Sequence, residues 1–474
     1  MSDRGPVPAS TPGDPIAAPG YAAAVDRIMS LADFERGTHS PGHATFHLER
    51  MTRLMDRLGD PHLATPTVHV AGTKGKGSTA AMISSILAAQ GYTVGLYTSP
   101  SLHSVVERIR VGLEPVGRQD FAGLVDQVWP ASLWVEEHGG HGAVMFFEFV
   151  TAMAFLHFKQ IGAGFQVIEV GLGGRLDATN VVSPEVCVIT PIMLDHVSVL
   201  GDTLELIAGE KAGIIKGRAP VIVAPQPPEA LDVFARVCAE RQAPLILIGK
   251  DVEWGKKHSD TTGQSFEVIG SAGAYGLWTP LLGDYQQENA ATAIAAIESL
   301  IDRGVAVSRE SIVKGVARVE WPGRLQVLSG RGKQVVVDGA HNPDSVRRLA
   351  EAVRQYFEFD RVLLLFGATR GHSAEGMLAQ IASLDPVVFP VRSRHPKSGP
   401  ADVIAADARE RGLAVSSGPE EVGAATRRAL EMAGERDLVL GTGSLSVAAE
   451  VIEEMQGMSP EIYPNIKMPS SRSA

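Results

Sequence analysis

Short apolar runs alternate along the first two thirds of the chain with segments whose apolar side chains recur at helical spacing. The runs predict strands at 67–71, 93–97, 166–170, 186–190 and 220–224. Strands without strict polar alternation are typical of sheets covered by helices on both faces. A helical pattern at 21–63, broken by polar residues at 36–40, precedes them. Residues 253–282 are richer in Gly, Thr and Ser and predict a small antiparallel excursion at the sheet edge. The pattern indicates a mostly parallel, doubly wound α/β sheet.

A second α/β series follows residue 321. Its predicted strands are 334–338, 361–366, 386–389 and 437–440, and its predicted helices are 343–356, 375–383, 419–433 and 444–455. About 150 residues is a common domain size, and we expect a smaller Rossmann-like domain here. The predicted organisation is a disordered tail at 1–20, a first domain at 21–320, a second domain at 321–456 and a loose tail at 457–474.

Composition and charge narrow the possible functions. The 474 residues are 45% hydrophobic and 20% charged, and 43 basic against 54 acidic residues give a net charge of −11. This balance argues against a general nucleic-acid or anionic-membrane binder, so an anionic substrate needs a local basic pocket. The apolar stretch 143–158 is short for a membrane span and contains Glu148 and His157. The two cysteines predict no disulfide framework and favour the reducing cytoplasm, and residues 1–20 lack the apolar core of a secretory signal.

A glycine-rich loop joins the predicted strand 67–71 to a predicted helix at about 78–90. The loop supplies Gly72, Thr73, Gly75, Lys76, Gly77 and Ser78. Glycines let backbone N–H groups surround an anion, the helix N-terminus adds positive partial charge, and Lys76 adds a full cation. The spacing departs from G-x-x-x-x-G-K-[ST] because Gly77 follows the lysine. A nucleoside-triphosphate site is predicted in preference to a solvated glycine-rich turn.

Further polar residues follow other predicted strands, where ligands bind in open parallel sheets. They are Ser99, Glu169, Asp195 and His196. Beside a triphosphate, such hydroxyl, carboxylate and imidazole groups can hold magnesium. Taken singly, each is also consistent with a structural role, as expected of a lone histidine after a strand.

Three other segments carry candidate chemistry. The loop 171–180 fails the dinucleotide pattern, and its glycines are interpreted as letting substrate approach the backbone. Lys211 lies among apolar residues, where an ion pair with Glu210 or a neighbour is the simplest reading. In 338–343, Asn342 and Pro343 suit a helix start, which leaves Asp338 and His341 as candidates facing an interdomain cleft.

Together these motifs resemble the folylpolyglutamate synthase/dihydrofolate synthase family, within the Mur-type ATP-dependent ligases. The resemblance extends over about residues 22–455. Its most specific blocks are 71–78, 98–100 with 107–109, 169–180, 195–196, 210–214, 321–324 and 338–343. It implies a P-loop ATPase domain followed by a Rossmann-like domain, with catalysis in the cleft between them.

The resemblance also implies roles for individual residues. Residues 75–78 would hold the ATP phosphates, and Ser99, Glu169 and His196 would bind magnesium. Asn289, Arg324 and Asp338 would hold ATP, with His341 near the γ-phosphate. Lys211 is similar to the family lysine that becomes N-carboxylated, which would replace the ion-pair interpretation and provide a ligand for a second magnesium.

Two residues depart from the family pattern. Lys74 stands where the family usually has Asn, so we expect activity with altered nucleotide affinity. The segment 146–149 resembles the pterin side of the site, but Met145 stands where Thr is common, which leaves the acceptor open between dihydropteroate, tetrahydrofolate or both.

The expected reaction transfers the γ-phosphoryl group of ATP to a folate-type carboxylate and lets L-glutamate attack the acyl phosphate. Expected partners are folate or dihydropteroate, L-glutamate and ATP, without nucleic acid or membrane, in a monomer. Alternatives are a Mur-type peptide ligase of cell-wall synthesis, which usually carries a sizeable domain before the phosphate loop, and a P-loop regulatory protein that uses ATP to control a partner.

Overall fold

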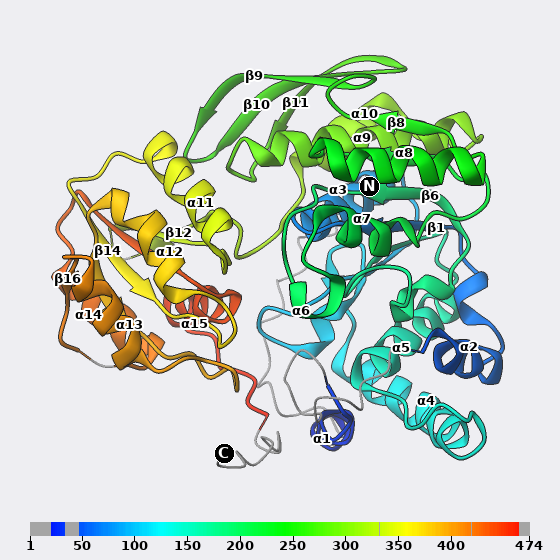
Figure 1. Ribbon diagram of the computed structural model, residues 1–474, viewed down its shortest axis with the longest axis horizontal. Coiled ribbons are helices and arrows are strands. Elements are labelled where there is room, and N and C mark those ends of the chain that lie inside the picture. Colours follow the sequence, from blue (N-terminus) through cyan, green and yellow to red (C-terminus); the bar gives the residue numbers. More distant parts are fainter. Residues whose placement is uncertain (1–19, 34–46, 331, 419, 464–474) are drawn as a thin grey trace, which may run out of the picture.

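The computed structural model describes residues 20–33, 47–330, 332–418 and 420–463. They form two lobes side by side, with a small antiparallel sheet above (Figure 1). The predicted disorder at 1–19 and 464–474 and the polar break at 36–40 lie outside the described residues. No helix among the described residues is long and apolar enough to cross a membrane.

The larger lobe is built on an eight-stranded sheet. In spatial order its strands are β4 (Glu114–Pro115), β3 (Ile109–Val111), β2 (Val94–Tyr97), β5 (Phe165–Glu169), β1 (Thr67–Ala71), β6 (Pro184–Ile189), β7 (Val221–Val223) and β8 (Leu245–Leu247). All pairs from β2 to β8 are parallel, and only β3 and β4 add antiparallel pairs at one edge. The doubly wound prediction is confirmed.

Helices cover both faces of this sheet. Alternate residues of β1, including Val68 and Val70, pack with α3 (Lys76–Ala89), α9 (Tyr285–Asp302) and α10 (Arg309–Ala317). The other face is covered by α1 (Tyr21–Met29), α2 (Leu48–Arg57), α4 (Arg118–His138) and α5 (Phe146–Gln160), and further along by α7 (Leu204–Ala212) and α8 (Pro228–Arg241). The short helix α6 (Val197–Leu200) lies beside the junction of the lobes (Figure 1).

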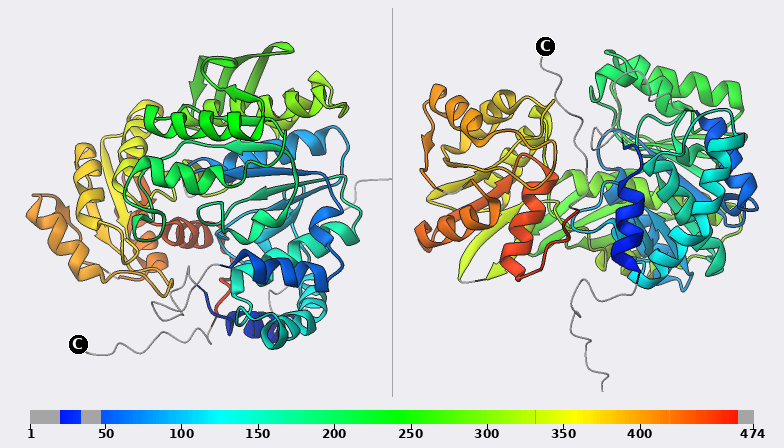
Figure 2. Two further views of the ribbon diagram at one scale, coloured as in Figure 1. Left: turned by 45° about the vertical axis from the view of Figure 1, so that its right-hand side comes forward. Right: turned by 90° about the horizontal axis from the view of Figure 1, so that it is seen from below.

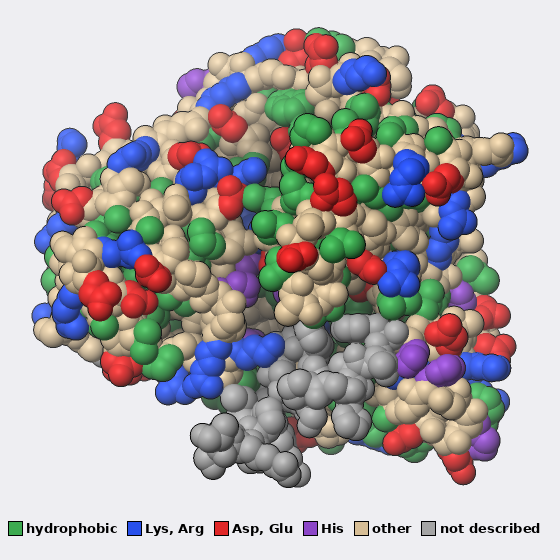
Figure 3. Space-filling view, in the orientation of Figure 1, with side chains coloured by type: hydrophobic (Ala, Val, Ile, Leu, Met, Phe, Trp, Pro, Cys, Tyr) green, Lys and Arg blue, Asp and Glu red, His purple; other side chains and the backbone are tan. Residues whose placement is uncertain are grey.

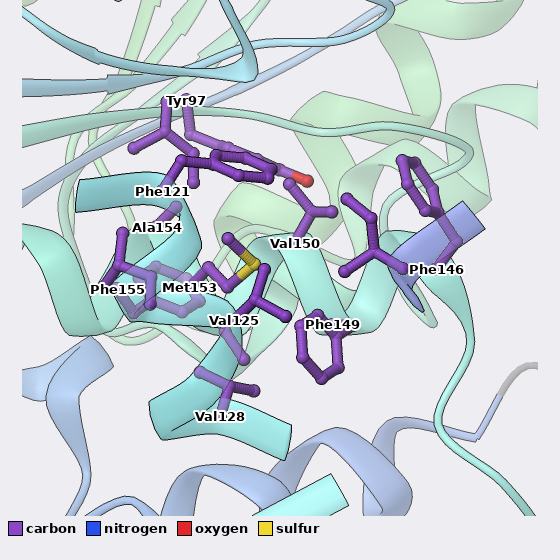
Figure 4. Close-up of a cluster of buried hydrophobic side chains, with 14 of the residues drawn as sticks. Tyr97, Phe121, Val125, Val128, Phe146, Phe149, Val150, Met153, Ala154 and Phe155 are labelled. Atoms are coloured by element: carbon purple, nitrogen blue, oxygen red, sulfur yellow. The ribbon is translucent and has the colours of Figure 1, made fainter. Parts of the chain in front are cut away.

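Aromatic residues fill the core between β2, α4 and α5. Phe121, Phe146, Phe149 and Phe155 are fully buried there, together with Tyr97 (Figure 4). The hydroxyl oxygens of Thr151 and Tyr97 are hydrogen-bonded at 2.9 Å, so the tyrosine's polar end is satisfied inside the core. The apolar stretch noted in the sequence is therefore the buried helix α5.

The antiparallel excursion exists, but it is not the edge of the large sheet. Strands β9 (Glu253–Asp260), β10 (Gly263–Gly270) and β11 (Gly273–Thr279) form a separate three-stranded sheet. One face of that sheet, with Phe266 and Val268, packs on α9. The sequence predicted the antiparallel pairing but could not show which helix would receive it.

The smaller lobe carries a six-stranded sheet. In spatial order its strands are β12 (Gln326–Gly330), β13 (Lys333–Val337), β17 (Asp437–Thr442), β14 (Arg361–Phe366), β15 (Val387–Pro390) and β16 (Ala414–Val415). Only β12 is antiparallel to its neighbour. Helices α11 (Pro343–Tyr356), α12 (Ala374–Ile381) and α13 (Ala401–Glu410) cover one face, and α14 (Val422–Met432) and α15 (Leu445–Gln456) cover the other.

The described chain end is not a loose extension of the second lobe. After α15, the segment up to residue 463 runs beside α1 of the first lobe (Figure 2). The Tyr21 hydroxyl donates to Glu461 at 2.6 Å, and the backbone N–H of Val105 donates to the Tyr463 hydroxyl at 3.0 Å. Within the predicted loose tail at 457–474, Glu461 and Tyr463 therefore contact the first lobe.

Candidate active site

A cavity of about 870 Å³ lies between the lobes. Figure 3 shows the molecular surface hollowed at this junction, with histidine side chains visible inside. The cavity is lined by most residues that the sequence singled out: Thr73, Gly75, Lys76, Gly77, Ser78, Ser99, Glu169, His196, Asn289, Arg324, Asp338 and His341. Residues that are hundreds of positions apart in sequence thus share one space.

The phosphate loop lies at the start of α3. Gly75 has a φ of 86°, and a side chain there would overlap the carboxamide of Asn289. The Thr73 and Lys74 backbone N–H groups donate to the carbonyl of Pro191 at 2.9 and 3.2 Å, which fixes the loop against the segment after β6. Gly72 lies at the base of the loop, where a side chain would overlap Thr190. The loop is held open at a helix N-terminus, the geometry that binds phosphate.

Lys76 begins α3 and extends toward the end of β5. Its Nζ lies 3.9 Å from Oε1 of Glu169, and the Lys76 side chain is 17% exposed. The Ser99 backbone N–H donates to the second carboxylate oxygen of Glu169 at 3.2 Å. A cation, a carboxylate and a serine therefore meet within the cavity.

The three predicted magnesium ligands differ in how firmly they are held. Glu169 is buried, whereas the His196 side chain is half exposed and its residue has a φ of 50°. Burial lowers the pKa of His196, against the opposing effect of Asp195, so the ring favours the neutral form that can ligate a metal. No three His, Cys, Asp or Glu residues within the described ranges group into a metal site.

This donor set still fits magnesium bound together with a nucleotide. Magnesium commonly takes one or two carboxylate ligands and completes its shell with phosphate oxygens and water. Glu169 supplies the buried carboxylate, Ser99 supplies a hydroxyl that also lines the cavity, and Lys76 of the phosphate loop lies 3.9 Å from Glu169. A magnesium site completed by phosphate oxygens therefore does not require a cluster of three histidine or acidic side chains.

The second lobe contributes the loop between β13 and α11. Both oxygens of the buried Asp338 carboxylate accept backbone N–H groups, from Leu325 at 2.7 Å and Ala340 at 2.8 Å. Asn342 caps α11 by accepting from the Ser345 N–H at 2.9 Å, with Pro343 at the first helical position, as the sequence predicts. Asp338 therefore shapes the loop that presents His341 and lies beside Arg324.

Lys211 lies on α7, buried against the loop 171–180 and outside the cavity lining. Burial and the nearby Lys76 lower its pKa to about 7, so a large fraction of the amine is neutral at physiological pH. The suggested ion pair with Glu210 is wrong, because Glu210 pairs with Arg175 at 2.8 Å. The Lys211 carbonyl accepts the Ile214 N–H at 3.2 Å, whereas the Lys211 amine forms no hydrogen bond or ion pair with any described residue.

The glycines of the loop 171–180 have a packing role that sequence alone did not show. A side chain at Gly174 would lie 2.8 Å from the Glu210 carbonyl oxygen, and one at Gly171 would overlap the Phe147 ring. These contacts let the loop rest directly on α7 and α5. The earlier interpretation, substrate approach to the backbone, does not account for Gly174.

Sequence reasoning missed several cavity residues. They are Tyr285 and Glu288 on α9, Arg348 on α11, Arg370 and His372 after β14, and His395 and Lys397 after β15. Burial raises the pKa of Glu288 to about 6, with Arg348 opposing the shift. The four residues after β14 and β15 could have been predicted from the sequence. They follow the carboxyl ends of predicted parallel strands, where ligands bind.

Family models match both lobes. The Mur ligase middle domain matches residues 148–297, and the Mur ligase glutamate ligase domain matches residues 323–445. The two lobes thus have the fold of a Mur-type ligase.

Individual relatives narrow this class. The dihydrofolate synthase/folylpolyglutamate synthase of Bacillus subtilis is 34% identical over 412 residues, which cover 86% of this chain and 95% of the relative. A folylpolyglutamate synthase of Mycobacterium tuberculosis solved with ADP superposes with a TM-score of 0.82 at 28% identity, covering 93% of this chain and 99% of that one. A folylpolyglutamate synthase solved with AMPPCP and folate gives 0.77 at 31% identity, covering 92% and 99%.

The chain belongs to the dihydrofolate synthase/folylpolyglutamate synthase family of ATP-dependent ligases. The resemblance drawn from its motifs is confirmed. The relatives do not support a cell-wall peptide ligase or a P-loop regulatory protein.

Proposed function

We propose that this enzyme adds L-glutamate to a folate-type carboxylate at the expense of ATP, converting dihydropteroate to dihydrofolate and extending the glutamate tail of tetrahydrofolate. One observation carries the proposal. The phosphate loop, the Ser99–Glu169 pair, the loop bearing His341 and the aromatic Phe147 all line a single cavity. This cavity is large enough for a nucleotide and an acyl acceptor to meet.

In the proposed reaction, the acceptor carboxylate attacks the γ-phosphorus of ATP and ADP leaves, giving an acyl phosphate. The amine of L-glutamate then attacks the acyl carbon, and phosphate and a proton are released as the amide forms. Lys76 and the loop N–H groups neutralise charge on the transferring phosphoryl group, which is mainly electrostatic and positional catalysis. The two lobes exclude water from the acyl phosphate.

Other residues hold the nucleotide in this proposal. Asn289 touches the phosphate loop from α9, and Arg324 and Asp338 extend the site from the linker and the second lobe. Glu169, Ser99 and His196 would hold magnesium, which supplies Lewis-acid stabilisation of the phosphate oxygens. His341 lies within reach of the phosphate loop through Lys74, at 3.1 Å.

The proposal includes carboxylation of Lys211. A buried amine with a pKa of about 7 has the neutral lone pair that adds to carbon dioxide, giving a carbamate and a proton. The product is an anion suited to a second magnesium. Protein equilibrated with ¹³C-bicarbonate should show a carbamate carbon resonance that is absent from Lys211→Arg. An identical spectrum for both proteins would contradict this assignment.

The decisive assay measures ADP release with each acceptor separately, with and without L-glutamate. We expect release to require both an acid and glutamate, with dihydropteroate and tetrahydrofolate each active. Equal release without either substrate would refute the ligase assignment. Activity with one acceptor only would restrict the enzyme to a single reaction, which Met145 at the start of α5 would then explain.

The proposal places a monomeric enzyme in the cytoplasm. Both cysteines, Cys187 and Cys238, are free and buried, as suits a reducing compartment. Size-exclusion chromatography with light scattering tests the monomer, for which a mass near 50.2 kDa is expected.

A further inference from the structure

Lys74 contacts both lobes at once. Its Nζ lies 3.2 Å from Oδ2 of Asp195 in the first lobe and 3.1 Å from Nε2 of His341 in the second. The Lys74 side chain is 23% exposed and that of Asp195 is 14% exposed. A residue of the phosphate loop is therefore bonded directly to the loop that opens α11.

The hydrogen bonds around His341 show which atom of the Lys74–His341 contact is the donor and which is the acceptor. Its Nδ1 lies 2.8 Å from the carbonyl oxygen of Gly339, which can only accept, so Nδ1 carries the proton. Nε2 is then an acceptor and requires a donor. The Lys74 ammonium, which has only donors, supplies it.

Each end of this bridge is fixed to its own lobe. Thr73 and Lys74 bond to Pro191 through their backbone N–H groups, and Asp195 accepts from the His196 N–H at 3.0 Å. On the other side, the His341 N–H donates to the Ser345 hydroxyl at 3.1 Å. Through its two contacts, Lys74 therefore joins the phosphate loop of the first lobe to the loop of the second lobe that carries His341.

We propose that Lys74 is a positioning residue that latches the second lobe over the phosphate loop, so that the acyl phosphate meets glutamate before it meets water. Asparagine at this position is too short to span from the loop to His341. Lys74 therefore affects the attack of glutamate on the acyl phosphate, in addition to nucleotide binding. This inference rests on the proposed function.

The latch makes a stoichiometric prediction. Attack by glutamate gives amide, phosphate and a proton, whereas attack by water returns the carboxylate and phosphate. Both routes consume one ATP, but only the first gives product. A loosened cleft consequently raises the ratio of ADP formed to glutamylated folate formed.

The experiment measures this ratio at saturating ATP and folate for the parent, Lys74→Asn and Lys74→Arg. We expect a ratio near one for the parent, a several-fold higher ratio for Lys74→Asn, and partial rescue by Lys74→Arg, which keeps a long donor. Small-angle scattering of Lys74→Asn should give a larger radius of gyration. In the double variant with His341→Asn, the ratio should rise no further than in Lys74→Asn.

Other outcomes overturn the latch. A ratio that stays at one while the KM for ATP rises would make Lys74 a phosphate-binding cation only. A ratio of one with a lower melting temperature would make its role structural. If Lys74→Asn does not fold, Lys74→Gln replaces it, and an unchanged ratio of ADP to glutamylated folate in that variant would overturn the latch. A parent enzyme that yields no glutamylated product would refute the proposed function itself, which keeps the two failures distinct.

Discussion

Arg50 and Glu148 form an ion pair inside the protein, with Nε 2.7 Å from Oε2 and side chains only 5% and 6% exposed. The same carboxylate accepts the Met145 N–H at 2.8 Å and so caps α5, the helix that carries Phe147 to the cavity. Arg50 also donates to the carbonyl of His141 at 2.8 Å. One buried pair thus connects α2, α5 and the loop before α5.

Removing one charge of this pair should destabilise the first lobe. Glu148→Gln leaves the Arg50 guanidinium buried without a counter-charge, a change that costs about 3–5 kcal/mol. Thermal unfolding should show a lower melting temperature, and the double variant Arg50→Met/Glu148→Met should recover part of the loss. If the double variant were less stable than Glu148→Gln alone, the pair would be a net stabilising contact and this argument would be wrong.

Lys76→Met tests the phosphate role directly. The variant keeps the length of the side chain but removes the cation beside Glu169, so kcat/KM for ATP should fall by about 100-fold or more. The melting temperature should fall less than in Glu148→Gln, because the Lys76 side chain is 17% exposed and its Nζ lies 3.9 Å from Glu169, beyond hydrogen-bonding distance. Lys250→Met, at an exposed loop position, serves as the control and should retain full activity.

Much of this site was predictable because its motifs are local. The strand 67–71 and the helix 343–356 were predicted at their observed bounds, since apolar runs and capping residues are short-range signals. The strand β12 and the helix α13 were missed, because β12 is a short antiparallel edge strand of mixed polarity and the buried face of α13 consists of alanines and Ile404.

The contacts that assemble the site were not predictable in the same way. Lys74 and His341 are 267 positions apart, and Arg50 and Glu148 are 98 apart. The sequence around each of these residues does not indicate its partner, because the pairing depends on how the two lobes and several helices pack. Residue types indicate which chemistry is possible, but tertiary packing determines which charged side chains lie in contact.

Gly77→Ala should disturb the nucleotide site through Trp321. A Cβ at Gly77 would lie 2.9 Å from Cζ2 and 3.1 Å from Nε1 of that indole, too close for unstrained contact. Trp321 stands next to the linker that carries Arg324, so we expect a raised KM for ATP together with a lower melting temperature. Isothermal titration with a non-hydrolysable ATP analogue measures the affinity.

The matched control for this variant is Gly123→Ala. Gly123 lies within α4, and a Cβ there would meet no atom within 4 Å. Alanine is favoured over glycine in a helix by roughly 0.5–1 kcal/mol, so this variant should be slightly more stable and fully active. Equal nucleotide affinity in both variants would show that the Gly77–Trp321 contact is not needed for binding.

Glu450 on α15 should make the stability of the protein depend on pH. Burial raises its pKa to about 7, against the opposing effects of the Arg394 backbone N–H and guanidinium. Its ordinary value is 4.5, so between these two values the folded protein binds more protons than the unfolded chain. Stability due to Glu450 is therefore full below about pH 4.5 and is lost as pH rises through 7.

Glu450→Gln should remove this dependence. The amide oxygen can still accept the Arg394 N–H, which lies 2.6 Å from Oε1 in the parent, but no charge has to be buried at high pH. Relative to the parent, the variant should gain about 1–3 kcal/mol between pH 5 and pH 8. Melting temperatures measured across that range test the sign, with Glu435→Gln as the exposed control. Parallel curves for Glu450→Gln and the parent would mean that Arg394 neutralises the carboxylate fully, because only then does ionisation in the folded state carry no penalty.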